Sequence, residues 1–136
     1  MSAAPELPEI PAAGLKSPEG WVELFVTAVR TCFSRYAVFT GRANRAEYWL
    51  FVLFCLLGSL VIAIFEGTIS DGDSTYLSAF FTLAVFLPSL AVQVRRLHDI
   101  DRTGWWAALA LIPVVGSLIL IWFCIQKGTA GTNRFG

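Results

Sequence analysis

The chain has 136 residues, of which 56% are hydrophobic and 15% are charged, and its formal net charge is zero. Soluble domains average roughly 45–50% apolar and about 25% charged residues, so this composition and the mean hydropathy of +0.65 indicate a membrane protein. The balanced charge argues against a nucleic-acid partner, which would require a basic, phosphate-tracking stripe. Three widely spaced cysteines, Cys32, Cys55 and Cys124, suit neither a disulfide framework nor a zinc site, and we expect them to be buried.

Residues 1–16 are rich in Ala and Pro and lack the basic and apolar regions of a signal peptide. Such a segment cannot bury enough apolar surface to order itself, so we expect a disordered N-terminal tail. The remainder, 17–136, is expected to form a single membrane domain.

A helix is predicted over about 17–36, where Ser17 suits the N-cap and Pro18 the first helical position. Its apolar residues recur with the period of one helix face, whereas Arg30 and Arg35 make it a poor membrane span. The pattern favours an amphipathic helix that lies in the membrane interface or packs on the inner end of the bundle. A helix that binds a regulatory partner is the alternative.

Three further segments, about 46–65, 76–94 and 105–125, are apolar and long enough to cross roughly 30 Å of hydrocarbon as helices. The predicted fold class is therefore an all-α integral membrane protein with three transmembrane helices preceded by an amphipathic interfacial helix. A Gly-rich tail, 126–136, follows. Asn44 and Glu47 resemble a capping box at the start of the first span, and Thr103 is a candidate N-cap for the third.

The third span is the one open to a second interpretation. Pro113 and Gly116 lie within it and could bend it into a re-entrant hairpin, which would return the tail to the side where the segment began. We predict that segment 105–125 crosses the membrane fully.

Orientation follows from the lysines and arginines. Five of them precede the first span, three lie between the second and third, and none lies between residues 66 and 75. The positive-inside rule therefore predicts a cytoplasmic N-terminus, and with three crossings a periplasmic or extracellular C-terminus.

Charged residues gather on the predicted cytoplasmic face, before the first span and after the second. They form a candidate polar cluster consisting of Arg42, Arg45, Glu47, Arg95, Arg96, His98, Asp99, Asp101 and Arg102. If the second span continues as a helix to Asp99, either Arg95 or Arg96 can reach that carboxylate. The favoured interpretation is a network of ion pairs that holds the helix ends together. The alternative is a basic pocket for a lipid headgroup or small anion.

The sequence gives little support for catalysis, metal binding or transport. His98, the single histidine, could be a base, a metal ligand or a proton switch, but it has no partners at familiar metal-ligand spacing. Adjacent helical residues point about 100° apart, so His98 and Asp99 do not form a dyad. We expect no enzyme activity, no cofactor and no metal. Transport would require several copies of the chain, because three helices enclose little volume.

Several motifs together resemble a known family. They are residues 39–49, 95–99, 102–106, 128–131 and 133–136, with Pro113 and Gly116 between them. In this order and spacing they resemble the small bacterial inner-membrane proteins catalogued as domain of unknown function 805. The resemblance covers about 21–136. It implies a multi-pass bacterial plasma-membrane protein with no settled activity, and it carries over no catalytic residue.

The function that these observations favour is a non-enzymatic structural or interaction component of the bacterial inner membrane. Its expected partners are membrane lipids and either further copies of the chain or another membrane protein. The alternative is a protein that binds an anionic lipid or small anion, or a transporter subunit, through the arginines of the polar cluster.

Overall fold

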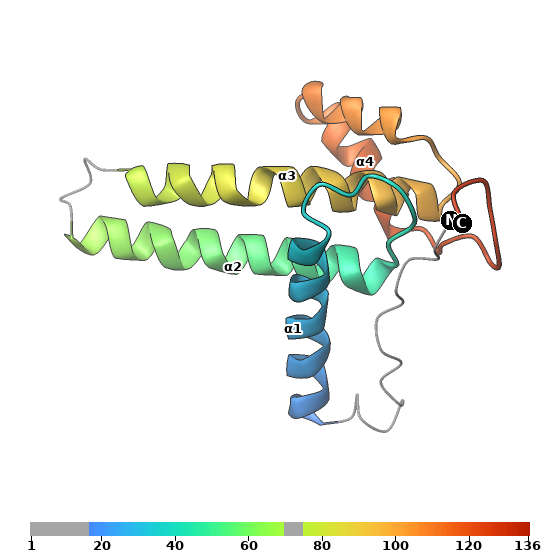
Figure 1. Ribbon diagram of the computed structural model, residues 1–136. Coiled ribbons are helices and arrows are strands. Elements are labelled where there is room, and N and C mark those ends of the chain that lie inside the picture. The colour runs from blue at the N-terminus through green and yellow to red at the C-terminus, as the bar shows by residue number, and fades with distance from the viewer. Residues whose placement is uncertain (1–16, 70–74) are drawn as a thin grey trace.

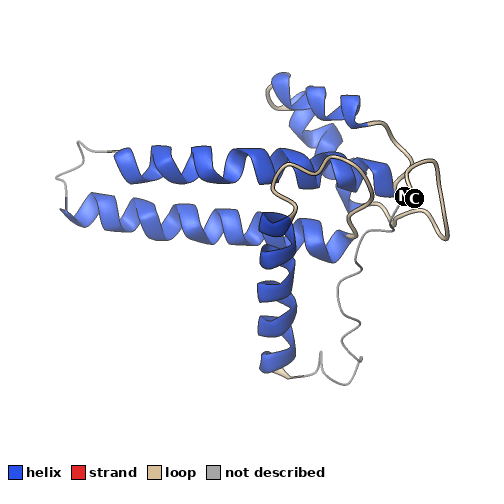
Figure 2. Ribbon diagram, viewed as in Figure 1, coloured by secondary structure: helices blue, strands red, loops and turns tan. Residues whose placement is uncertain are grey.

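The computed structural model describes residues 17–69 and 75–136, so the predicted tail over 1–16 lies outside the described residues. The helices are α1 (Pro18–Ser34), α2 (Arg45–Ile69), α3 (Tyr76–Asp99), the 3-10 helix η2 (Gly104–Leu111) and α4 (Val115–Ile125). Figure 1 shows their order along the chain, and Figure 2 shows helices and loops without a strand in the part drawn in colour. The predicted all-α class is confirmed.

Helices α2 and α3 form an antiparallel pair of spanning length. With 25 and 24 residues they extend about 37 and 36 Å, enough for a hydrocarbon core of roughly 30 Å. Both are apolar enough to cross a membrane, and large side chains such as Leu56, Val61 and Leu83 are mostly exposed along them. An outward apolar surface of this kind is suited to lipid tails rather than to water.

Helix α1 crosses the α2–α3 pair instead of running along it (Figure 1). Ser17 caps its start by accepting a hydrogen bond from the backbone N–H of Gly20 at 3.3 Å, as predicted. One face packs on α2, where Ala28 and Cys32 are fully buried and the rings of Phe33 and Phe51 meet edge to face. The apolar face of α1 is therefore explained by its packing against the part of α2 around Phe51.

The third apolar segment is not one helix. It consists of the eight-residue η2 and the eleven-residue α4, each about 16 Å long, which is too short to cross roughly 30 Å of hydrocarbon. The two pack against one another and against Leu97 of α3. The predicted third crossing over 105–125 is thus not confirmed: in the described residues two helices have spanning length, and a hairpin follows them.

The turn of this hairpin has a local physical cause. Pro113 has no backbone N–H to donate, and Val114 adopts a φ of 65°, which a β-branched residue rarely does. Gly116 is buried where a Cβ atom would overlap the carbonyl oxygen of Leu109 in η2. The chain therefore reverses at Pro113 and Val114, and glycine at 116 allows η2 and α4 to approach closely.

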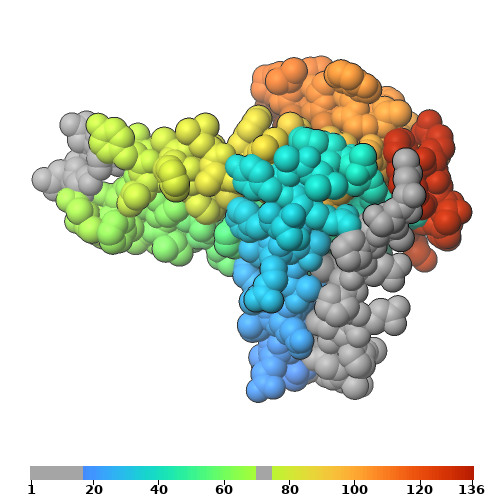
Figure 3. Space-filling view, viewed as in Figure 1, coloured from blue at the N-terminus to red at the C-terminus, as the bar shows by residue number. Residues whose placement is uncertain are grey.

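Because α4 runs back, the C-terminal segment lies at the same end of the α2–α3 pair as Arg42. The backbone N–H of Thr129 donates to the carbonyl of Asp99 at 2.7 Å, and Arg42 donates to the carbonyls of Gly131 and Gly136 at 2.6 and 3.3 Å. The C-terminal segment and the polar cluster therefore lie at the same end of the helix pair, and the predicted placement of the C-terminus on the opposite side of the membrane is not confirmed. In Figure 3 the bulk of the molecule gathers at this end, where α1, the hairpin and the C-terminal segment meet.

The other end of the α2–α3 pair is closed by a carboxylate. Glu66, near the end of α2, accepts hydrogen bonds from the backbone N–H groups of Leu77 and Ser78 at 2.7 and 3.1 Å and from the Ser78 hydroxyl. Thr75 provides no side-chain cap for α3, so Glu66 satisfies the free donors of its first turn. This contact holds the two helices in register far from the polar cluster.

Candidate functional site

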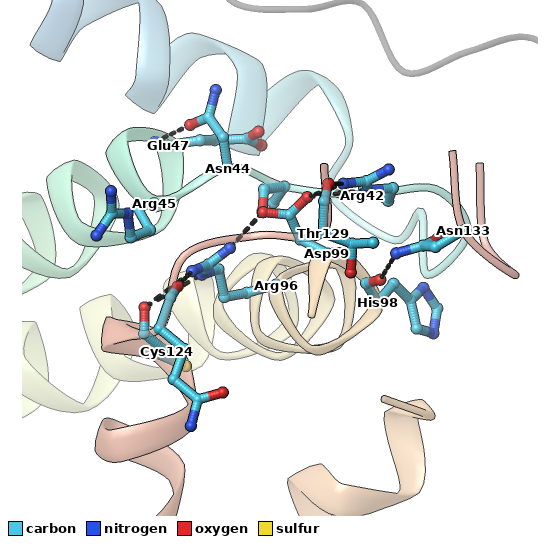
Figure 4. Close-up of polar contacts among 12 residues, drawn as sticks. Arg42, Asn44, Arg45, Glu47, Arg96, His98, Asp99, Cys124, Thr129 and Asn133 are labelled. Atoms are coloured by element: carbon cyan, nitrogen blue, oxygen red, sulfur yellow. Dashed lines mark hydrogen bonds and ion pairs between the residues drawn. The ribbon is translucent and has the colours of Figure 1, made fainter. Parts of the chain in front are cut away.

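The candidate site lies where α2 begins and α3 ends. The backbone N–H of Ala43 donates to the carbonyl of Arg95 at 3.0 Å, which brings the segment before α2 against the last turn of α3. Six predicted residues share this region and form what we call the buried cluster: Arg42, Glu47, Arg95, Arg96, His98 and Asp99. Figure 4 shows most of them converging from α2, α3 and the segment that precedes α2.

Arg95 and Glu47 form the innermost ion pair. Arg95 Nη1 donates to Glu47 Oε1 at 2.6 Å, and the two side chains are 0% and 6% exposed. The same oxygen is 3.8 Å from the thiol of Cys32 in α1, which orients α1 on the pair. In the described chain, Nε and Nη2 of Arg95 are buried without a partner, so Glu47 is the group that neutralises this arginine.

Whereas Arg95 contacts α2, Arg96 contacts the hairpin and so joins it to α3. It pairs with Asp99 one turn on and donates to the carbonyls of Cys124 and Gln126, with Nε and Nη2 respectively 3.2 and 3.1 Å from the Cys124 oxygen. Those carbonyls belong to the end of α4, where backbone acceptors lack helical partners. One guanidinium thus fastens the last turn of α4 to α3.

Arg42 and Asp99 fasten the C-terminal segment. Arg42 Nη2 lies 2.8 Å from Asp99 Oδ1 and donates to the carbonyl of Thr129 at 2.6 Å. A Cβ atom at Gly128 would overlap the Asp99 carboxylate, which explains why the segment passes this point with a glycine. The Asp99 carboxylate is shared between Arg42 and Arg96, so all three charges are used inside the protein.

His98 is also held by structural contacts. Its Nδ1 is 2.9 Å from the carbonyl of Gly41, and its ring stacks on Phe135 with centroids 3.9 Å apart and planes 3° from parallel. Asn133 donates to its backbone carbonyl at 2.8 Å. Within residues 17–69 and 75–136 no group of three or more His, Cys, Asp or Glu residues could hold a metal ion.

The other three predicted residues lie outside the buried cluster. Asp101 pairs with Arg134 at 3.1 Å, and the hydrogen bond from Arg134 lowers the pKa of the Asp101 carboxyl. Arg102 stacks over the rings of Trp106 and Phe123 at 5.3 and 5.1 Å. Arg45 is exposed and lies apart from Asp99 in Figure 4.

Only one of the two hydrogen bonds of the predicted capping box is present. The Asn44 side chain accepts a hydrogen bond from the backbone N–H of Glu47 at 2.8 Å, as an N-cap does. Glu47 does not complete the box, because its carboxylate accepts from Arg95 instead. Thr103 occupies the N-cap position of η2 without a side-chain hydrogen bond.

The sequence did not identify the C-terminal partners of the cluster. They are Cys124, Gln126, Thr129, Gly131, Asn133, Phe135 and Gly136. Most contribute backbone carbonyls, which no residue type marks. The available signal was the presence of the motifs 128–131 and 133–136 in this segment, which is unlike a simple flexible tail.

The cysteine beside the cluster is not a nucleophile. Burial, then the negative charge of Glu47, raises the pKa of the Cys32 thiol to about 12, so the thiol remains protonated at neutral pH. Among the described residues the arrangement therefore neutralises charge and holds helices together, with the Cys32 thiol in its protonated form.

Two apolar helices long enough to cross a membrane, joined at one end by the buried Arg95–Glu47 ion pair, indicate a small membrane protein. The chain belongs to the family described as protein of unknown function (DUF805), which matches residues 36–136. The resemblance predicted from the sequence motifs is thereby confirmed.

Its relatives include two inner membrane proteins of Escherichia coli (strain K12). The chain is 47% identical to inner membrane protein YhaH over 104 residues, which cover 74% of this chain and 86% of YhaH. It is 45% identical to inner membrane protein YhaI over 101 residues, which cover 74% of this chain and 85% of YhaI. The uncharacterized protein YiiR of the same strain is 30% identical over 123 residues, which cover 72% of this chain and 83% of YiiR. No solved structure matches the chain.

Proposed function

We propose that the protein is a non-enzymatic structural or interaction component of the bacterial inner membrane. The observation that carries this proposal is that the charges of the buried cluster bind one another and backbone carbonyls from α4 and the C-terminal segment. A catalytic or transport site would instead leave charged groups facing a substrate. The cluster's role is then to hold the hairpin in place.

The hairpin itself is the surface that we propose to meet a partner. Its outer face is apolar and exposed: Trp105 is 87% exposed, Leu111 85% and Trp122 60%. Two short helices that do not cross the membrane alone can present such a face sideways, to a second copy or to another membrane protein.

We further propose that both the buried cluster and the C-terminus are cytoplasmic. None of the ten lysines and arginines lies between residues 46 and 94 of the sequence, and Arg45 is the first residue of α2. With the hairpin returning the C-terminal segment to Arg42, Lys127 and Arg134 join the same side. This strengthens the asymmetry on which the positive-inside rule rests.

A topology reporter fused after Gly136 should therefore give a cytoplasmic signal. An inserted reporter between residues 70 and 74 provides the matched control and should report the periplasmic side. A periplasmic signal after Gly136 would contradict the orientation and, with it, the hairpin arrangement in the membrane.

Crosslinking in intact cells tests the interaction role. A photocrosslinking amino acid at Leu111, exposed on the hairpin, should yield a discrete crosslinked protein species, whereas the same probe at Val92, 1% exposed, should yield none. The proposal fails if Leu111 and Trp105 probes capture only lipid and the purified protein is strictly monomeric in mild detergent. Loss of a cellular function in a folded His98→Gln variant with unchanged crosslinks would favour an enzyme instead.

A further inference from the structure

An apolar groove lies outside the buried cluster, between α1 and the start of α2 and beside the last residue of α4. Its volume is about 390 Å³, within the range of small-molecule sites. The residues that matter for its chemistry are Trp21, Arg45, Ala46, Trp49, Leu50 and Ile125. In the described part of the chain, Arg45 is the only charged residue in its lining.

Arg45 differs from the arginines of the buried cluster because it is exposed and nearly unpartnered. The contact that it makes is a hydrogen bond at 3.4 Å to the carbonyl of Ile125, at the long limit for such a bond. It is also the first residue of α2, where a positive charge is unfavourable beside the positive end of the helix dipole. Helix stability therefore does not explain this arginine, and an anion placed on it would relieve the repulsion.

The rest of the lining suits the membrane interface. Trp49 donates its indole N–H to the carbonyl of Cys124 at 3.2 Å, and Trp21 on α1 is 54% exposed. Tryptophans of this kind gather where hydrocarbon meets headgroups. Helix α1 crosses the spanning pair near the start of α2 (Figure 1). The groove between them therefore lies near the end of the α2 span, where the headgroups of the membrane are expected.

We propose that this groove binds one phospholipid with a net negative headgroup. The headgroup phosphate accepts hydrogen bonds from the Arg45 guanidinium, and the first part of an acyl chain lies along Trp21, Leu50 and Ile125. A single cation above an apolar surface matches an amphiphile better than a free phosphate, which would gain nothing from the apolar lining. The site is independent of the proposed interaction role, because neither the hairpin's outer face nor the buried cluster contributes to it.

Native mass spectrometry of the purified chain with added phosphatidylglycerol or phosphatidylcholine tests the proposal. We expect retention of one phosphatidylglycerol, about tenfold weaker binding of it in Arg45→Gln, and weak binding of phosphatidylcholine throughout. Arg30→Gln is the matched control, because it removes the same charge from an exposed α1 residue outside the groove. Neither substitution removes a buried contact, so both variants should fold.

A second variant tests the apolar half of the site. Ala46→Phe fills the groove without changing charge and should also weaken phosphatidylglycerol retention, and a photoactivatable acyl chain should label Leu50 or Ile125 in the parent chain. Equal retention in Arg45→Gln and Arg30→Gln, equal binding of both lipids, or labelling confined to a second copy of the chain would each overturn the proposal.

Discussion

Replacing Arg96 by alanine should destabilise the protein by about 3 kcal/mol or more and free the C-terminal segment. Breaking a buried ion pair from one side typically costs about 3–5 kcal/mol, because the remaining groups lose their partner without regaining water. Here the carbonyl of Gln126 loses its Arg96 donor, and the carbonyl of Cys124 keeps the Trp49 indole but loses both of its hydrogen bonds from Arg96. Chemical unfolding in detergent micelles measures the stability, and limited proteolysis reports the release of the segment.

Arg134→Ala is the control for this prediction. Arg134 also pairs with a carboxylate, that of Asp101, but the two side chains are 61% and 43% exposed. An exposed pair contributes about 0–1 kcal/mol, so this variant should unfold almost as the parent does. Equal effects of the two substitutions would show that burial of Arg96 does not govern the stability of the hairpin.

The second large effect is expected at Glu47. In Glu47→Ala, Arg95 remains fully buried while its only hydrogen-bonding carboxylate is gone, and two of its nitrogens already have no partner in the described chain. We expect a loss of about 3–5 kcal/mol, measured by unfolding in detergent. The pairing of α1 with α2 should weaken as well, because Cys32 contacts the same carboxylate oxygen.

The double variant Glu47→Leu with Arg95→Met tests whether the loss of stability comes from leaving Arg95 unpaired or from changing residue 47 itself. Apolar residues of similar volume can replace a buried ion pair at little cost, so most of the lost stability should return. A double variant as unstable as Glu47→Ala would mean that Arg95 has a role besides neutralising Glu47.

Features that depend on local sequence were predictable. Ser17 and the apolar period gave α1 within two residues at each end, and Asn44 was correctly placed as a cap. The pairing of Arg96 with Asp99 followed from helical spacing once α3 was taken to continue to Asp99. These features are contacts between residues close in sequence, so periodicity and capping rules apply to them directly.

The hairpin and its contacts could not be decided in this way. A proline inside an apolar stretch is compatible with a kinked span or with a reversal, and the choice depends on Gly116 packing against Leu109 and on Arg96 reaching Cys124. Glu47 likewise left its predicted capping role because a buried arginine competes for the same carboxylate. Tertiary contacts determine both the hairpin and the position of the Glu47 side chain, and these contacts cannot be inferred from composition or local sequence patterns.

The attachment of α4 to Arg96 has a consequence for biosynthesis. The ribosome adds Cys124 and Gln126 respectively 28 and 30 residues after Arg96, a delay of roughly a few seconds at bacterial rates. Arg96 cannot make these contacts in any chain that ends before them. A stop codon placed shortly before Cys124 should therefore leave Arg96 without these two carbonyl acceptors and make the product short-lived rather than merely shorter.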